Sequence, residues 1–173
     1  MAANLRYHGG MSKQEASLHE AALLYLGRYE ASVQSLRRVL RRKVERWARK
    51  EAREVAEAEL AAVEAVVERL QRSGAVDDRR YAEMKAASLQ RAGRSARAIR
   101  AYLAGRGVAS EVTQASIADD GDFDAALRLA QKKRLGRFRP REGRAQSRQR
   151  DLAALGRAGF SYEIARRVVD GED

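Results

Sequence analysis

The chain has 173 residues, with 35 lysines and arginines against 24 aspartates and glutamates, which gives a formal net charge of +11. It contains no cysteine, which excludes disulfides, thiolate metal sites and cysteine nucleophiles. No apolar run approaches the roughly 20 residues that cross a bilayer, and the start of the chain lacks the apolar core of a signal peptide, so we expect a cytoplasmic protein without a membrane partner. The cationic balance favours a polyanionic partner, above all nucleic acid, although a helical protein of an arginine-rich proteome would share it.

The first third of the chain predicts a tail followed by helices. Residues 1–16 show no helical period and are expected to form a flexible N-terminal tail. Ser17 and Glu20 have the spacing of a capping box and predict the start of the first helix. Ser32 opens the next helix, in which eight cations from residue 37 to residue 50 oppose Glu45 alone, a local balance of +7. Because no glycine or proline lies between residues 28 and 73, the sequence leaves open one long helix or two helices joined near residues 56–61.

The middle of the chain contains a short basic helix with clear start and stop signals. Asp77 and Asp78 begin a helix over residues 77–92, and we interpret these carboxylates as helix caps rather than as catalytic groups or metal ligands. Ser95 is the expected N-cap of a helix over residues 95–106, and Gly107 can adopt the left-handed conformation that ends it. A further helix from Ser110 to about residue 118 follows.

The last third begins with an acidic turn and contains a second basic segment. Residues 119–124 lack the glycine and glutamate positions of a calcium loop, so we interpret them as a turn that ends in the N-cap Asp122. Residues 132–150 contain nine cations against Glu142, with Phe138 among them. This segment is either a phosphate-contacting loop or a solvated linker. Helices over residues 142–158 and 161–170 are expected to close the chain.

The ending of the basic helix recurs along the sequence. Leu103-x-x-Arg106-Gly107 has a later counterpart in Leu155-x-x-Ala158-Gly159 and an earlier, degraded one in Leu40-x-x-Lys43-Val44. This repetition predicts an all-α fold built from three tandem three-helix modules that resemble helix-turn-helix units. We place the modules at residues 17–73, 77–118 and 122–170.

No motif in the sequence supports catalysis. The two histidines, His8 and His19, have no partner at metal-ligand spacing, and the serines do not lie in a nucleophile elbow. The phosphate loop of P-loop proteins and the dinucleotide fingerprint are both absent from the sequence. We therefore expect a protein that is not an enzyme, with no catalytic residues, no metal site and no cofactor.

Three stretches carry a resemblance to a known family. They are Ala75-Val76-Asp77-Asp78-Arg79-Arg80-Tyr81-Ala82, then Gly93-Arg94-Ser95-x-x-x-Ile99-x-x-x-Leu103-x-x-Arg106-Gly107-Val108, and finally Leu155-x-x-x-Gly159-Phe160. In these the chain resembles the RecX family of recombination regulators, which inhibit RecA. The resemblance implies an elongated, curved array of three modules that binds the RecA filament on single-stranded DNA and suppresses its ATPase, recombinase and coprotease activities, and thereby acts in DNA repair and the SOS response.

The first module departs from the family's pattern. Where the family usually has Lys-Gly, this chain has Lys43-Val44, and residues 45–59 look inserted. Because the missing glycine removes a helix stop, we expect longer helices here than in the family's other members.

The charge pattern and the placement of the cations give a candidate interface with the filament or with nucleic acid. Its residues are Arg94, Arg97, Arg100, Arg106, Lys132, Lys133 and Arg134. We expect the partners to be the RecA filament and single-stranded DNA, either directly or within the filament, and we expect a monomer. The alternative is a helix-turn-helix protein or transcription factor that reads the major groove of duplex DNA.

Overall fold

The structure, a computed structural model, describes residues 10–118 and 121–171. Within these ranges the chain contains helices, turns and loops and no strand, which confirms the all-α prediction. The chain divides into two compact units, Met1–Asp78 and Arg79–Asp173. His8 and the acidic residues 119–120 lie outside the described ranges.

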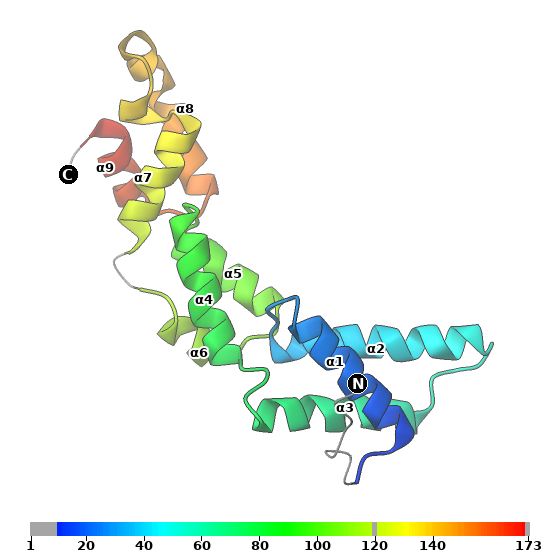
Figure 1. The fold of residues 1–173 in the computed structure, drawn as a ribbon. Helices are drawn as coiled ribbons and strands as arrows, with labels where there is room; N and C mark the ends of the chain where they lie inside the picture. Colours follow the sequence, from blue (N-terminus) through cyan, green and yellow to red (C-terminus); the bar gives the residue numbers. More distant parts are fainter. Residues whose placement is uncertain (1–9, 119–120, 172–173) are drawn as a thin grey trace, which may run out of the picture. The chain divides into compact units, whose positions relative to one another are not determined.

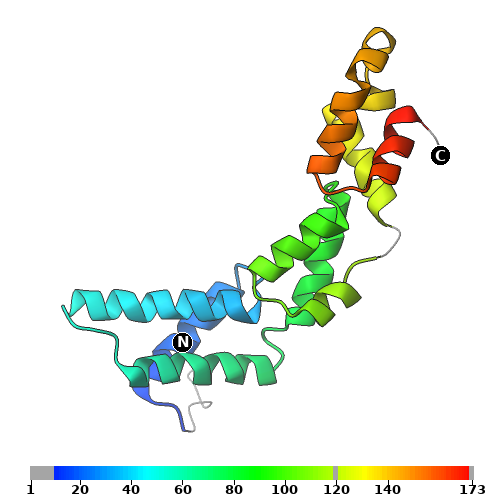
Figure 2. The same ribbon diagram turned by 180° about the vertical axis from the view of Figure 1, so that it is seen from behind.

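The first unit is built from three helices around one hydrophobic core. These are α1 (Lys13–Leu26), α2 (Val33–Lys50) and α3 (Glu57–Arg72). Figures 1 and 2 show α2 and α3 running side by side, with the segment that joins them at one end. Leu18 from α1, Leu40 from α2 and Val67 from α3 are fully buried in this core.

Helix α1 begins earlier than the sequence pattern predicts. The Ser12 hydroxyl accepts a hydrogen bond from the Glu15 N–H (3.1 Å), and the Ser12 N–H donates to the Glu15 carboxylate (3.2 Å). This capping box replaces the predicted one at Ser17, which lies inside the helix. The expected tail over residues 1–16 is therefore wrong at residues 13–16, and its residues 1–9 lie outside the described part of the chain.

Two separate helices, rather than one long helix, span residues 33–72. Helix α2 continues through the fully buried Val44 for 18 residues, whereas α5 (Ala96–Gly105), which ends near the glycine at 107, has 10. The chain then leaves the helix at residues 51–56, where Ala52 adopts a positive φ of 51°, and α3 begins at Glu57. The break thus falls earlier than the residues 56–61 at which a junction was expected.

The second unit contains two groups of helices, each with its own core. The first group is α4 (Asp78–Arg91), α5 and α6 (Ser110–Ala115), packed around Tyr81, Ile99 and Leu103. The second group is α7 (Gly121–Lys133), α8 (Arg144–Arg157) and α9 (Tyr162–Asp170), with short 3-10 turns at Gly136–Phe138 and Arg141–Gly143 before α8. Leu155 and Val168 are fully buried in the core of this second group.

The repeated sequence ending corresponds to a repeated helix ending. Gly107 and Gly159 adopt left-handed backbone conformations, with φ of 76° and 94°. In both places the N–H of the next residue bonds to the carbonyl of the motif's leucine, from Val108 to Leu103 at 3.1 Å and from Phe160 to Leu155 at 3.2 Å. The predicted N-caps are also present, because the side chains of Ser32, Ser95 and Ser161 each accept a first-turn N–H.

The predicted role of Asp122 is wrong. Helix α7 begins at Gly121, so Asp122 lies in its first turn and is not its N-cap. Its carboxylate instead accepts a hydrogen bond from the Ala96 N–H of α5 at 2.6 Å. The side chain therefore caps a helix in the other group of the second unit.

Candidate nucleic-acid interface

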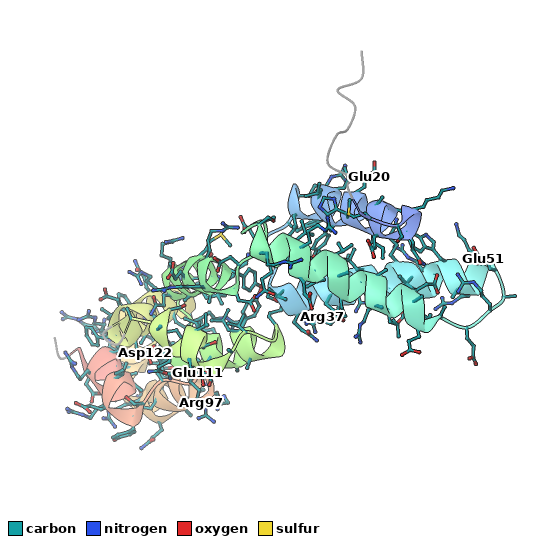
Figure 3. All side chains as sticks on the ribbon, turned by 90° about the horizontal axis from the view of Figure 1, so that it is seen from below. Glu20, Arg37, Glu51, Arg97, Glu111 and Asp122 are labelled. Atoms are coloured by element: carbon teal, nitrogen blue, oxygen red, sulfur yellow. The ribbon has the colours of Figure 1, made fainter. Side chains whose placement is uncertain are left out.

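The N-terminus of α5, the short basic helix of the sequence analysis, is held by three hydrogen bonds. The Ser95 hydroxyl accepts from the Ala98 N–H (3.2 Å) and donates to the Ala158 carbonyl at the end of α8 (2.7 Å). Asp122 supplies the third contact through the Ala96 N–H. Figure 3 labels Arg97, the second residue of α5, and Asp122 of α7. These bonds join α5 to both α7 and α8, so the arginines after Ser95 are presented from a fixed helix end.

An open pocket of about 500 Å³ lies beside this anchor, where α4, α7 and α8 end. We name it the basic groove, because four cationic side chains line it: Arg94, Lys132, Lys133 and Arg157. Leu129 and Ala154 supply apolar surface between them. All four residues are exposed, and within the described part of the chain none of their side chains makes a hydrogen bond or ion pair.

Gly93 permits the close packing at the edge of the basic groove. It adopts φ of 78°, and a Cβ there would lie 3.1 Å from both the Ala125 carbonyl oxygen and the Leu129 backbone nitrogen. A larger residue would therefore push the end of α4 away from α7. Glycine at this position lets Arg94 and the two lysines line one pocket.

The structure brings only part of the predicted interface together. Arg94, Lys132 and Lys133 line the basic groove, whereas Arg97, Arg100, Arg106 and Arg134 are exposed outside its lining. Arg97 lies against the end of α8, since a Cβ built on Gly159 would be 3.4 Å from its Cβ. Arg100 donates to the Gln114 side chain at 3.3 Å, and the Arg106 guanidinium lies 5.1 Å from the centre of the Tyr102 ring.

Arg157 is a groove residue that the sequence reasoning missed. It lies two residues after Leu155 and two before Gly159, inside the repeated helix ending. The repeated helix ending could have predicted this position. Because the repeat predicts where α8 ends, a cation beside that end can be expected near the basic residues of the neighbouring module. Its position becomes clear only once α8 is packed against α7.

The basic segment between α7 and α8 is structured by its own charges. Arg139 forms two hydrogen bonds with the buried carboxylate of Asp151, at 2.8 and 3.1 Å, and the Gly136 N–H donates to the same carboxylate at 2.8 Å. Burial acts to raise the pKa of Asp151, but the bonds from Arg139 and Gly136 outweigh it and lower the pKa. Arg148 pairs with Asp170 through two bonds of 2.7 Å. Several cations of this segment therefore stabilise the fold, and it is not a solvated linker.

Two further observations bear on what the described residues can do. They contain no group of three or more histidine, cysteine, aspartate or glutamate side chains that could hold a metal ion. None of the helices over residues 10–118 and 121–171 has the length and apolar character needed to span a membrane.

Helix groups with an open cationic groove between their ends are typical of binding proteins. The positive charge of the groove suits a polyanionic partner. The family model for RecX, second three-helix domain, matches residues 77–117, which contain α4, α5 and α6. The regulatory protein RecX of Myxococcus xanthus is 49% identical over 158 residues, covering 88% of this chain and 84% of that protein. The chain belongs to the RecX family of regulatory proteins.

A more distant relative and two solved structures agree with this assignment. The regulatory protein RecX of Agrobacterium fabrum is 36% identical over 95 residues, which cover 55% of this chain and 52% of that protein. A crystal structure of regulatory protein RecX matches with a TM-score of 0.68 at 19% identity, over 91% of this chain and 72% of that one. The crystal structure of RecX from Lactobacillus salivarius matches with a TM-score of 0.66 at 16% identity, over 93% and 97%. At these identities the two structures show the likeness of fold.

Proposed function

We propose that this protein binds the RecA filament on single-stranded DNA and inhibits the recombinase, ATPase and coprotease activities of RecA. Its membership of the RecX family supports the proposal. The observation that carries it is the basic groove, where four exposed cations from three helix ends line one open pocket. A regulator of this kind acts by binding alone, so the proposal includes no catalytic residue and no cofactor.

The chemistry of the basic groove fits phosphates or carboxylates on the filament. The guanidinium groups of Arg94 and Arg157 can each pair with an oxyanion through two parallel hydrogen bonds, while Lys132 and Lys133 add point charges. Because no described residue pairs with these four side chains, binding an anion does not require breaking an existing ion pair. We propose that the protein does so as a cytoplasmic monomer.

Binding to preassembled filaments tests this role of the groove. Changing all four residues to glutamine (Arg94→Gln, Lys132→Gln, Lys133→Gln and Arg157→Gln) should weaken binding to RecA assembled on single-stranded DNA at least about tenfold, or about 1.4 kcal/mol. The expected cause is the loss of charge-assisted hydrogen bonds. Biolayer interferometry with the filament immobilised through the DNA measures the affinity.

A control with the same change in charge separates the groove from net charge. Lys13, Arg28, Arg72 and Arg141 are exposed and lie outside the groove. Replacing these four with glutamine should leave filament binding within about twofold of the wild type, since surface charges away from a contact contribute little. Equal loss in both variants would contradict a specific role for the groove. Sequence-selective binding to duplex DNA that survives moderate salt would instead favour the helix-turn-helix alternative.

A further inference from the structure

The exposed apolar side chains of the first unit gather at the C-terminal end of α1. Leu23 and Leu24 are 47% and 64% exposed, and Tyr29, just past the helix, is 58% exposed. In the described part of the chain only two other large apolar side chains are exposed, Leu60 on α3 and Tyr162 on α9. Single exposed leucines are common on protein surfaces, whereas a group of them at one place marks an interaction site.

Helix stability does not require leucines at this position. The last turn of α1 contains no basic residue, although cations are the side chains that stabilise a helix there. The two leucines are also not part of the core, because Leu18 and Ala22 form the buried face of α1. Gly27 follows them by four and three residues and is exposed on the same side, where its lack of a side chain lets a second helix approach closely. We name Leu23, Leu24 and Gly27 the α1 patch.

A row of exposed residues through the α1 patch carries opposite charges at its two ends. Glu20, Leu24 and Arg28 follow one another at spacings of four, which places them in one row along the helix. Arg28 lies just past the end of α1, but its N–H donates to the Tyr25 carbonyl (3.0 Å), so the backbone still follows the helical path there. Figure 3 labels Glu20 on the side of α1 that faces away from α2 and α3. Among the residues that the structure describes, neither charged side chain has a hydrogen-bond or ion-pair partner.

We propose that the α1 patch is a weak docking site for a second copy of this chain, with the two α1 helices packed antiparallel across a twofold axis near Leu24. In such a pair, the residue four positions before Leu24 lies opposite the residue four positions after it in the other copy. Glu20 of each copy therefore faces Arg28 of the other. The contact goes beyond the proposed function, because it uses no residue of the basic groove and needs neither RecA nor nucleic acid.

The two charges select a second copy over a partner of one charge sign. An acidic surface laid along the row would meet Glu20, and a basic surface would meet Arg28. A second copy in the antiparallel orientation satisfies both charges at once and brings the leucines of the two patches together. The row is thus complementary to itself.

The size of the contact makes the pair weak and reversible. One helix end from each copy buries less than the roughly 800 Å² per partner of a standard interface. The net charge of +11 adds repulsion between copies, which salt screens beyond about 8 Å at physiological ionic strength. We expect a dissociation constant between about 10 µM and 1 mM, so the protein is a monomer at the low concentrations at which it is proposed to act on RecA.

Sedimentation velocity of the full chain measures the pair, at about 0.15 M salt and from about 10 µM to 1 mM protein. The wild type should shift from monomer to dimer over this range. Leu24→Gln, which keeps a high helix propensity, should weaken the association at least about tenfold. The matched control Leu60→Gln changes an exposed leucine of α3 outside the α1 patch, and it should stay within about twofold of the wild type.

Exchange of the two charges tests the antiparallel arrangement. Glu20→Arg alone places arginine opposite arginine, and Arg28→Glu alone places glutamate opposite glutamate, so each should weaken the pair at least about tenfold. The protein that carries both substitutions should regain the wild-type affinity. An equimolar mixture of the two single variants should also form dimers, because every arginine then faces a glutamate. Far-ultraviolet circular dichroism should show the same helix content in all of these proteins.

Three results would overturn the proposal. They are a wild-type protein that remains a monomer at about 1 mM, single charge variants that associate as the wild type does, and a double variant or mixture that associates no better than the single variants. The measurement contains neither RecA nor nucleic acid, so its failure leaves the proposed role of the basic groove intact. Equally, a protein that forms the pair but does not inhibit RecA would contradict the proposed function and not this docking site.

Discussion

Gly156 and Gly159 lie three residues apart at the end of α8. They differ in the space that is available for a Cβ atom. A Cβ on Gly156 would have no atom within 4 Å, whereas one on Gly159 would lie 2.5 Å from the Ser95 Oγ. The hydroxyl of Ser95 cannot easily move, because it is bonded to both Ala158 and Ala98. Gly159 also has φ of 94°, which favours glycine.

Alanine at these two positions should change stability in opposite directions. Gly159→Ala should lower the free energy of unfolding by about 1–3 kcal/mol, through backbone strain and the clash with Ser95. Gly156→Ala should raise it by about 0.4–1 kcal/mol, because it reduces the entropy of the unfolded chain at a helical position. Urea unfolding followed by circular dichroism measures both. A Gly159→Ala protein as stable as the wild type would show that Ser95 does not hold the end of α8.

Single residues also show where sequence reasoning stops. The caps at Ser32, Ser95 and Ser161 were predictable, because each serine bonds to an N–H three residues later in its own helix. The bond of Asp122 was not predictable, because its partner Ala96 is 26 residues away. The local sequence indicates only that Asp122 could cap its own helix. Asp78 behaves in the same way, because its carboxylate accepts from the Val33 N–H, 45 residues away.

At the scale of elements, α1 and α3 are joined by a buried carboxylate. Glu59 accepts two bonds of 2.8 Å from Arg53, one of 2.9 Å from the Ala56 N–H and one of 2.8 Å from Gln14 of α1. The bonds from Arg53, then that from Ala56, lower the pKa of Glu59 to about 2, against the burial that would raise it. This one side chain therefore connects α1, α3 and the segment before α3.

The lowered pKa of Glu59 predicts that the first unit loses stability in acid. The folded pKa is below the unfolded one of about 4.3, so the contribution of Glu59 is fully present above that pH. It is lost as the pH falls toward about 2, because the unfolded state binds the proton first. Trp47, the only tryptophan of the chain, lies in the same unit and lines a pocket with Glu59.

Thermal unfolding followed by the fluorescence of Trp47 measures this effect. The melting temperature of the wild type should fall between about pH 4.5 and pH 2. The Glu59→Gln protein should be less stable at neutral pH and should show a smaller change over the same range, because glutamine does not titrate. Parallel pH profiles for the two proteins would contradict the role assigned to Glu59.

The elements themselves were largely predictable, and the errors have physical causes. Ser12 and Ser17 both match the capping-box pattern with a glutamate three residues later, so the pattern alone cannot choose between them. Ser12 prevails in the structure, and α1 starts there. The break between α2 and α3 carries no glycine or proline, and its location depends on the contacts of Arg53 and Glu59, which a local pattern does not contain.

At the scale of the molecule, the second unit contains two helix groups that were expected as separate modules. The bonds from Ser95 to Ala158 and from Ala96 to Asp122 join these groups, and the basic groove lies beside that junction. Three of the groove's four cations, Arg94, Lys132 and Lys133, were predicted, because they lie in basic stretches that are visible in the sequence. The sequence could not separate them from the other predicted cations, Arg97, Arg100, Arg106 and Arg134, since the lining of a pocket is set by packing between distant helices.

The measurement that most directly tests the central claim is the single-stranded-DNA-dependent ATP hydrolysis of RecA with this protein added well below the RecA concentration. We expect inhibition by amounts too small to coat the DNA, together with loss of that inhibition in the variant that neutralises Arg94, Lys132, Lys133 and Arg157. Inhibition that begins only when the protein saturates the DNA, or no inhibition at all, would contradict action on the RecA filament.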